Sequence, residues 1–468
     1  MNPPLSNTES RSENRSNVPV VTDYSQRGQE GTLEEPAIER AREATICVVG
    51  LGYVGLPLAV RFAEANFDVV GFDVDESKVE TLQNGVDTTG DLTDEAVAES
   101  GVSYTTEASQ IADADYVIIA VPTPVDCDNR PDFDFVEAAA STVGSKMTAG
   151  ATVILESTVY PGATREVMIP ALEETSGMTA GEDFFVGYSP ERATPGDEEH
   201  GLADVVKVVS GQTDQVLEDV AALYESVVDA GVHRAPSIEV AEASKVVENT
   251  QRDLNIAFVN ELSMAFERLD VDTRAVLEAA GTKWNFHDYR PGLVGGHCIP
   301  VDPYFLAYQS EQAGFTPELI QTGRAVNEQV PQHVADLTIK ALNECQKTLC
   351  ESRVLVLGLS YKAGVGDIRS SKIANVVEKL KEYDIGIEGY DPFADADAIH
   401  DEFGIDVQTE LDFTDFDAIL LGTPHEEFVE MDLEHAAAEL NEKPALVDVT
   451  AALDENAVAD AGFVYRRV

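Results

Sequence analysis

Residues 46–55 read Ile46-Cys47-Val48-Val49-Gly50-Leu51-Gly52-Tyr53-Val54-Gly55, an apolar run that leads directly into glycines at the spacing G-x-G-x-x-G. The apolar run predicts a buried strand, and helical spacing follows from about Val54 to Ala65. Here Gly50 permits a tight turn, Gly52 lets the backbone approach a pyrophosphate, and Gly55 allows the helix to pack closely. The stretch therefore predicts a dinucleotide-binding unit, with Tyr53 and Val54 as further cofactor contacts.

An acidic residue follows this unit where a ribose ligand is expected. Asp73 ends the next predicted strand, about 20 residues after the glycines. A carboxylate there accepts hydrogen bonds from the adenosine ribose and repels a 2′-phosphate, so we expect NAD rather than NADP. Lys78 either contacts the same region or is a solvated helix residue.

Short apolar runs alternate with amphipathic stretches along most of the chain. Buried strands are predicted at 46–49, 69–72, 116–121, 152–155 and 205–209, with helices between them. Ile238 to Leu269 contains no Pro or Gly and keeps helical spacing. It predicts one long helix, which either carries a dimer interface or is buried within one subunit. A second α/β pattern opens at Arg353.

These patterns predict an α/β fold of two Rossmann-like, doubly wound parallel-sheet domains, joined by a helical central domain with one long helix. The first 43 residues are polar and lack apolar periodicity, which predicts a disordered acidic tail. The expected division is tail 1–43, NAD-binding domain 44–236, central helical domain with the dimer interface and a cysteine loop 237–348, and C-terminal α/β domain 349–468.

The charge of the chain excludes some partners. Lys and Arg total 31 against 86 Asp and Glu, a formal net charge of −55 over 468 residues. Such a chain repels nucleic acid and anionic membranes, and we expect neither as a partner. The acidic residues are spread over every predicted domain, which indicates a halophilic protein that needs salt to screen its self-repulsion.

The remaining composition favours a cytoplasmic protein. No apolar run approaches the roughly 20 residues that span a bilayer, and Met1 to Ser10 lacks the apolar core of a secretory signal. Five cysteines, an odd number, fit a reducing compartment. Cys345 and Cys350 have no nearby His at metal spacing, so we expect no metal site.

Cys298 lies in the glycine-rich segment Arg290-Pro291-Gly292-Leu293-Val294-Gly295-Gly296-His297-Cys298-Ile299-Pro300-Val301-Asp302. A thiol beside a nicotinamide can trap an aldehyde as a thiohemiacetal, so that a second oxidation gives a thioester. The predicted product is then a carboxylate. The alternative is a small buried hydrophobic residue, the commoner fate of a free cysteine.

Other candidate residues follow strands or share a helix face. Pro122 and Thr123 follow one predicted strand, and Thr158 follows the next, where doubly wound sheets bind ligands. The threonines either contact the cofactor or cap helices. Lys245 and Asn249 stand four residues apart on the long helix and can reach a common ligand.

Together these motifs resemble the nucleotide-sugar 6-dehydrogenases, the UDP-glucose/GDP-mannose dehydrogenase family. The resemblance runs from about Ile46 to about Val449. It rests on the following ordered segments: 50–55, 121–124, 156–158, 189–192, Lys245 with Asn249, 295–298, and Lys362 with Asp367, Arg369 and Ser370.

The resemblance implies an NAD-dependent, four-electron oxidation of a sugar C6 alcohol to the acid, with two NAD per product. Cys298 matches the nucleophile, Lys245 and Asn249 match the groups that stabilise the oxyanion, and Asp302 matches a residue that orients water or the lysine. Thr158 and Glu191 match residues that handle the water and proton in thioester hydrolysis. Separately, we expect a homodimer or larger homo-oligomer, since a long helix that links two α/β domains often carries a dimer interface.

The resemblance also implies a UDP-sugar-binding role for the C-terminal domain. Cations are rare in this chain, so Lys362 and Arg369 suggest a phosphate site, with Arg369 also near the cofactor. Arg324 and Arg290 either contact diphosphate or sugar or form structural ion pairs. The complete set of substrate candidates is Glu191, Arg192, Lys245, Asn249, Arg252, Arg290, Gly295, His297, Arg324 and Lys362.

Two departures favour a particular branch of the family. Val301 stands where the UDP-glucose branch has Lys, and Pro195 replaces a second acid. The segments 189–192, 251–257 and the His297-Cys298 pair resemble the UDP-N-acetylhexosamine branch, which acts on UDP-GlcNAc, UDP-GalNAc or UDP-ManNAc in polysaccharide biosynthesis. UDP-glucose 6-dehydrogenase is the alternative.

Three other classes of protein would share some of these motifs. A two-electron hydroxy-acid dehydrogenase would share the fold but would not need Cys298. A short-chain epimerase would need Tyr-x-x-x-Lys, and none of the 14 tyrosines has Lys four positions later. A nucleotide-sugar sensor, which is not an enzyme, could lose Cys298, Lys245 or Asp302, yet all three are present.

Overall fold

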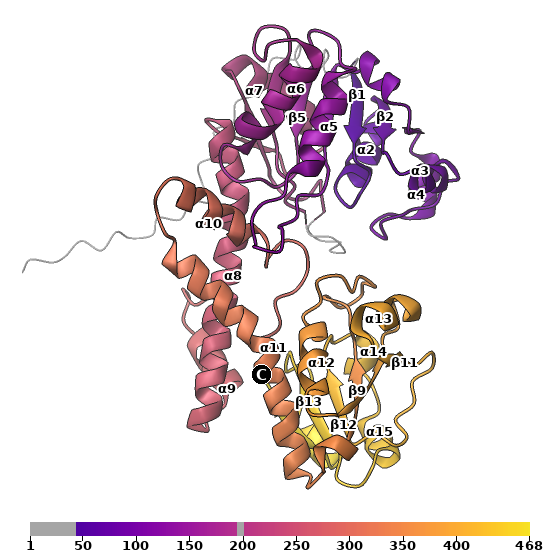
Figure 1. The fold of residues 1–468 in the computed structure, drawn as a ribbon, viewed down its shortest axis with the longest axis vertical. Helices are drawn as coiled ribbons and strands as arrows, with labels where there is room; N and C mark the ends of the chain where they lie inside the picture. Colours follow the sequence, from indigo (N-terminus) through magenta and orange to yellow (C-terminus); the bar gives the residue numbers. More distant parts are fainter. Residues whose placement is uncertain (1–43, 194–200) are drawn as a thin grey trace, which may run out of the picture.

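The computed structural model describes residues 44–193 and 201–468, so the predicted tail and Pro195 lie outside the described residues. Its two sheets lie at opposite ends of the molecule, with the helices α8 and α11 between and beside them (Figure 1). This arrangement confirms the predicted fold class.

The N-terminal sheet has eight strands in the order β3-β2-β1-β4-β5-β6-β7-β8. All neighbouring strands are parallel except β6 and β7. The five predicted strands are confirmed, each to within about two residues, whereas β3, β6 and β8 were not predicted. The bounds are β1 Thr45–Val49, β2 Asp68–Phe72, β3 Ser103–Thr105, β4 Tyr116–Ile119, β5 Thr152–Leu155, β6 Phe185–Tyr188, β7 Lys207–Gly211 and β8 Val232–Arg234.

Helices cover both faces of this sheet. Alternate residues of β1 point to opposite sides: Cys47 and Val49 join one apolar core, and Ile46 and Val48 join the other. Because successive side chains of a strand alternate, a strand that is buried on both faces is apolar throughout, as β1 is. The helices are α2 Gly55–Glu64, α3 Glu76–Gln83, α4 Asp94–Glu99, α5 Asp134–Gly144, α6 Ile169–Ser176 and α7 Asp214–Glu225.

The long helix α8 spans Ile238–Leu269, as predicted. Ser237 caps its start, where the hydroxyl accepts a hydrogen bond from the Val240 amide, and Asp270 ends it in the left-handed conformation (φ 56°). α8 packs along α11 and α10. The other helices of this region are α9 Thr273–Gly281, α10 Asp302–Gln312 and α11 Glu318–Glu344.

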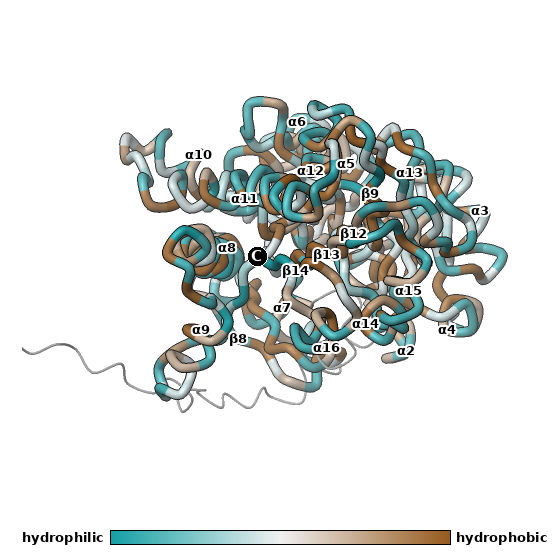
Figure 2. The backbone as a smooth tube through the Cα atoms, turned by 90° about the horizontal axis from the view of Figure 1, so that it is seen from below, coloured by the Kyte–Doolittle hydropathy of each residue, from teal (hydrophilic) through white to brown (hydrophobic). Residues whose placement is uncertain are grey.

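The C-terminal sheet has six parallel strands in the order β11-β10-β9-β12-β13-β14. Figure 2 shows hydrophobic residues concentrated around β9, β12 and β13. The strands are β9 Arg353–Leu357, β10 Gly386–Tyr390, β11 Asp406–Val407, β12 Ala418–Leu421, β13 Ala445–Asp448 and β14 Val464–Arg467. The helices are α12 Ile373–Lys381, α13 Ala396–Phe403, α14 Glu426–Val429, α15 Leu433–Glu439 and α16 Glu455–Asp460.

None of the helices in the described part of the chain is both long enough and apolar enough to cross a membrane.

Candidate functional site

The turn between β1 and α2 has the shape of a phosphate cradle. Gly50 has φ +93°, and a Cβ there would lie 2.6 Å from the Ala120 carbonyl oxygen. A Cβ on Gly55 would lie 1.8 Å from the carbonyl oxygen of Gly50. At Gly52, by contrast, a Cβ would meet no described atom within 4 Å, so this part of the turn is open to a ligand. No side chain caps the start of α2, where the Leu56 amide already bonds the Gly52 carbonyl at 3.0 Å and Pro57 has no amide. An anion would therefore meet the amides of the turn that leads into the helix.

Asp73 sits at the end of β2 and is almost buried. Its Oδ2 accepts hydrogen bonds from the Leu51 amide and from Lys78 Nζ, both at 2.9 Å, and its Oδ1 accepts one from the Asp75 amide at 3.0 Å. Burial alone would raise the pKa of Asp73, but these donors outweigh burial and lower it. Lys78 thus forms an ion pair with Asp73, the residue expected to bind the ribose. The positive charge of Lys78 therefore lies near the expected position of the ribose.

The C-terminal domain repeats this local arrangement. Gly358 follows β9 with φ +79°, and the Asp391 carboxylate accepts hydrogen bonds from the Leu359 and Ser360 amides at 2.8 and 3.1 Å. Here His425, fully buried, takes the place of Lys78, with Nε2 at 3.2 Å from Asp391 Oδ2. Burial opposes the shift, yet His425 and the backbone donors lower the pKa of Asp391 to about 2. The sequence interpretation missed both residues.

Cys298 lies in a loop that two parts of the molecule hold in place. Asn260 of α8 exchanges two hydrogen bonds with Gly292, at 2.8 and 3.1 Å. At Gly296, which has φ +86°, a Cβ would lie 2.9 Å from the Tyr361 ring of the C-terminal domain. The loop therefore joins the central helices to the C-terminal domain, and the Cys298 side chain within it is exposed.

The loop runs into α10, whose first residue is Asp302. Asn249 on α8 donates a hydrogen bond to Asp302 Oδ2 at 2.5 Å. Burial raises the pKa of Asp302 to about 6, although the Lys245 charge and Asn249 oppose the shift. Desolvation of the sulfur and the Asp302 charge also raise the pKa of the Cys298 thiol, and Lys245 again opposes the shift.

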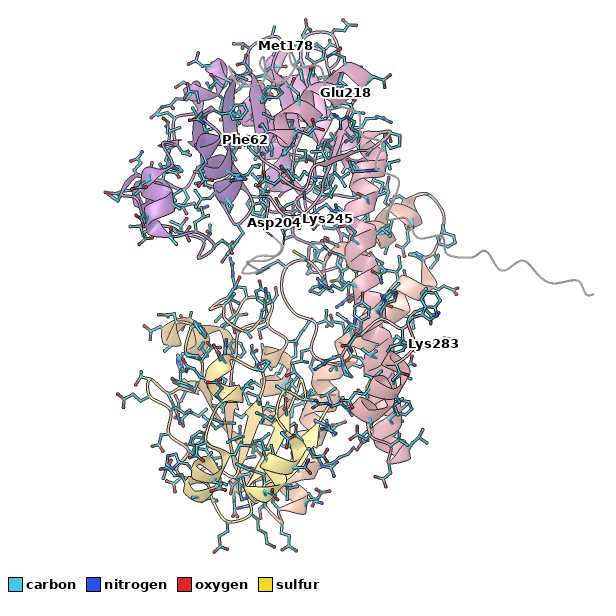
Figure 3. The ribbon with its side chains drawn as sticks, turned by 180° about the vertical axis from the view of Figure 1, so that it is seen from behind. Phe62, Met178, Asp204, Glu218, Lys245 and Lys283 are labelled. Carbon is cyan, nitrogen blue, oxygen red and sulfur yellow. The ribbon has the colours of Figure 1, made fainter. Side chains whose placement is uncertain are left out.

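Lys245 faces this group from α8. Figure 3 shows it on α8 where the helix leaves the N-terminal domain. Within the described residues it forms no hydrogen bond and no ion pair, yet its charge acts on both Asp302 and Cys298. The structure thus brings Cys298, Lys245, Asn249 and Asp302 together, and a partly exposed ammonium there can stabilise a developing oxyanion.

The loops after β5 and β6 carry the next candidates. Ser157 ties them to the β4 loop, since its hydroxyl bonds both the carbonyl and the amide of Val121, at 2.7 and 3.0 Å. Pro122 is exposed, whereas Thr123 and Thr158 are half-buried. Glu191 is bound to Lys207, a buried residue at the start of β7 that the sequence interpretation missed.

Tyr53 and Arg369 lie near one another although they belong to different domains. The charges of Asp367 and Arg369 act on Tyr53, whose pKa burial raises, and the Tyr53 charge acts in turn on Arg369. Asp367 binds Arg369 Nη2 at 2.7 Å and His297 Nε2 at 3.1 Å. The nucleotide turn, the Cys298 loop and the C-terminal domain therefore converge.

The remaining substrate candidates differ in burial and in their partners. Arg324 is 2% exposed and is bound to Asp253 and Glu328, which is the structural ion pair that the sequence left open. Arg192 bonds Glu248 of α8 at 2.7 Å. Of the others, Arg252 and Arg290 are exposed, Gly295 packs on the Ser370 carbonyl, and Lys362 is half-buried.

Comparisons with known proteins agree with this geometry. Models of the UDP-glucose/GDP-mannose dehydrogenase family match residues 44–228 (NAD binding domain), 239–329 (central domain) and 355–455 (UDP binding domain). Protein CapL of Staphylococcus aureus is 47% identical over 82% of this chain and 91% of its own length. The UDP-N-acetyl-D-glucosamine 6-dehydrogenase of Salmonella typhi is 44% identical over 87% of this chain and 96% of its own length.

A similar solved structure is the UDP-D-ManNAc dehydrogenase of Pyrococcus horikoshii. It superposes with a TM-score of 0.82 at 31% identity, covering 91% of this chain and 99% of that one.

Proposed function

The chain belongs to the UDP-glucose/GDP-mannose dehydrogenase family and is an NAD-dependent oxidoreductase, and on that premise we propose that it oxidises the C6 alcohol of a UDP-N-acetylhexosamine to the acid. The observation that carries this proposal is the convergence of Cys298, Lys245, Asn249 and Asp302 beside a nucleotide turn.

The turn at Gly50–Gly55 fits a dinucleotide, because Gly52 is open and no side chain occupies the start of α2 as a cap. Each of two NAD molecules, bound there one after the other, would accept one hydride. Lys245 and Asn249 would stabilise the negative oxygen that develops at C6. Cys298 Sγ would form a bond to the aldehyde carbon, and the resulting thiohemiacetal would be oxidised to a thioester.

Hydrolysis then releases the acid and needs a water and a carboxylate. Thr158 and Glu191 would handle that water and its proton, with Asp302 as an orienting group. The UDP part would lie against the C-terminal domain, beside Lys362 and Arg369, where His297 of the Cys298 loop meets Asp367.

The choice of sugar is supported by the relatives and by one residue of this chain. Two relatives above 40% identity are named as UDP-N-acetyl-D-glucosamine 6-dehydrogenases. Val301, just before Asp302, leaves no cation where the UDP-glucose branch has Lys. We therefore place UDP-GlcNAc first, with UDP-GalNAc, UDP-ManNAc and UDP-glucose as alternatives.

The test is an incubation in high salt with NAD and a panel of UDP-GlcNAc, UDP-GalNAc, UDP-ManNAc, UDP-glucose and GDP-mannose. We expect two NADH per sugar consumed, with the highest kcat/KM for UDP-GlcNAc. One NADH per sugar, or an acid product from the Cys298→Ser variant at an undiminished rate, would overturn the proposed mechanism.

We further propose a homodimer that uses α8, the connection between α10 and α11, and the start of α11. Apolar side chains are exposed there, namely Val247, Phe258, Phe315 and Leu319. Light scattering during gel filtration tests this, and Phe258→Glu should shift the dimer toward monomer.

Three proposals concern the setting of the enzyme. All five cysteines are unpaired, which supports a reducing, cytoplasmic compartment, and the net charge of −55 supports a halophilic one. The product, an activated sugar acid, suits polysaccharide biosynthesis.

A further inference from the structure

Lys207 is a lysine with almost no access to solvent, and two carboxylates share its charge. It is 2% exposed, and its Nζ lies 2.9 Å from Glu156 Oε2 and 3.2 Å from Glu191 Oε2. These two acids follow neighbouring strands, β5 and β6, and Lys207 begins β7. A lysine is buried at such a place only when its partners offset the cost of removing its charge from water.

On one side, the Glu191 carboxylate is fixed at both oxygens. Its Oε1 accepts hydrogen bonds from the Arg192 and Ala193 amides at 2.6 and 2.5 Å, while its Oε2 faces Lys207. Burial alone would raise the pKa of Glu191, but Lys207 and these amides outweigh burial and lower the pKa. Glu191 therefore stays ionised and cannot rotate freely.

On the other side, Glu156 competes for the same ammonium group. Its side chain is fully buried, and its Oε1 accepts a hydrogen bond from the Tyr224 hydroxyl at 2.5 Å. Burial raises the pKa of Glu156 to about 7, with Lys207 opposing the shift. Glu156 therefore titrates near neutral pH. When it is ionised it attracts Lys207 and weakens the interaction of Lys207 with Glu191, and when it is protonated that interaction strengthens.

Among the described residues, few other charged or titratable groups face this cluster. Tyr224 comes from α7 and Tyr188 from β6, and burial raises the pKa of both hydroxyls well above its ordinary value, so both stay neutral. The charges of Glu242 on α8 and Asp302 on α10 act on Tyr188. The Arg192 guanidinium turns away to Glu248 on α8. Within the described part of the chain, Lys207 is therefore the cation that acts directly on Glu191.

We propose that Lys207 is a positioning residue that keeps Glu191 ionised and aimed for thioester hydrolysis, and that Glu156 with Tyr224 regulates this effect. The inference rests on the proposed function. In the step concerned, a water oxygen bonds to the acyl carbon and the C–S bond breaks. Glu191 accepts the proton of the water, the Cys298 sulfur is released as thiolate and regains a proton, and no electrons are transferred.

The first experiment measures the acyl group on Cys298 during turnover by intact-protein mass spectrometry. Lys207→Met should lower kcat by about tenfold or more and make the Cys298 adduct accumulate, because hydrolysis becomes limiting. The KM for NAD should stay within about twofold. Lys207→Arg keeps the charge and should restore most of kcat. The control Lys347→Met breaks a partly buried pair with Asp417 in the C-terminal domain and should accumulate no more adduct than the unmodified enzyme.

The second experiment uses Glu156→Gln, since removing a buried cation can also destabilise the fold. This variant keeps residue 156 uncharged at every pH. Because Glu156 is already protonated in the pH range where Glu191 titrates, the acidic limb of the kcat profile should keep its position, and the change of kcat near pH 7 that follows the ionisation of Glu156 should disappear. Lys207→Met should instead move the acidic limb upward by about one unit. An acidic limb that Lys207→Met leaves in place, a change of kcat near pH 7 that persists in Glu156→Gln, or a Lys207→Met enzyme that is folded and shows no accumulated adduct would overturn the inference. Failure of the proposed function is distinct, because the unmodified enzyme would then yield neither NADH nor adduct.

Discussion

The Asn249 side-chain amide donates a hydrogen bond to Asp302 Oδ2 at 2.5 Å and so joins the middle of α8 to the first turn of α10. The Asp302 amide in turn bonds the Cys298 carbonyl at 2.9 Å. The position of the cysteine loop therefore depends on a contact between residues 53 apart in the sequence.

Asp302→Asn should stabilise the fold above neutral pH while impairing catalysis. Burial raises the pKa of Asp302 to about 6, so the folded chain binds more protons than the unfolded chain between about pH 4 and 6. Its contribution to the free energy of unfolding thus falls as pH rises through this window. Urea unfolding at pH 8 should show a gain of about 2–3 kcal/mol, which disappears near pH 4.

The control Asp391→Asn has the opposite sign, because the pKa of Asp391 is lowered to about 2 in the folded chain. It should lose stability at pH 8 and lose less near pH 3. If both variants changed stability in the same direction at pH 8, the assignment for Asp302 would be wrong.

Gly296→Ala should lower kcat by more than the strain of an alanine at positive φ would cause. A Cβ at Gly296 would lie 2.9 Å from the Tyr361 ring, so the Cys298 loop must move. Gly314 has nearly the same φ, +83° against +86°, yet its Cβ would meet no described atom within 4 Å. Both alanine variants should lose about 1–2 kcal/mol of stability, but only Gly296→Ala should lower kcat, by about tenfold. Equal kcat values would contradict this.

Gly52→Ala and Gly55→Ala should separate binding from folding. The first adds a Cβ where only a ligand can meet it, so the KM for NAD should rise about tenfold or more with an unchanged Tm. The second places a Cβ 1.8 Å from the Gly50 carbonyl oxygen and should lower the Tm markedly. A Gly52→Ala protein with ordinary NAD affinity would argue against a pyrophosphate at this turn.

Asp73→Asn should weaken the preference for NAD over NADP. The Asn oxygen can still accept the Leu51 amide hydrogen bond, while the negative charge beside the ribose is removed and Lys78 is left to attract a 2′-phosphate. The ratio of kcat/KM for NAD to that for NADP should fall about tenfold or more. The prediction fails if activity with NADP does not improve relative to NAD.

High salt should stabilise the protein. A formal charge of −55 repels itself within the folded state, and salt screens that repulsion. The Tm should rise by tens of degrees between about 0.2 and 3 M KCl, because the Debye length shortens over this range of salt concentration and the repulsion weakens. A Tm that is flat or falling over this range would contradict a halophilic enzyme.

The parts predicted from sequence are those whose signal is local. α8 was predicted to the residue because Ser237 starts it and no Pro or Gly interrupts it. β3 and β8 were missed because strands of three residues are too short to show a period, and β6 was missed because Gly187 interrupts its short apolar run.

Charge pairs were predicted less well. Lys207 begins an apolar strand, and no local sequence pattern predicts its pairing with Glu156, which lies 51 residues away. Arg324 was a substrate candidate with a structural alternative, and only its burial against Asp253 selects the ion pair.

The sequence by itself determined the nucleotide turn, the acid that favours NAD, the long helix and the segment that carries Cys298. Each of these depends on backbone conformation and spacing within a short stretch of the chain. Glycines mark the tight turns, and the spacing of apolar residues marks the helices and strands. The tertiary structure alone decided which ionisable groups are buried and paired: Asp302 with Asn249, Lys207 with Glu156 and Glu191, and Asp391 with His425. The reason is physical, because desolvation and Coulomb interactions depend on distance in space, and folding brings together groups that the chain keeps far apart.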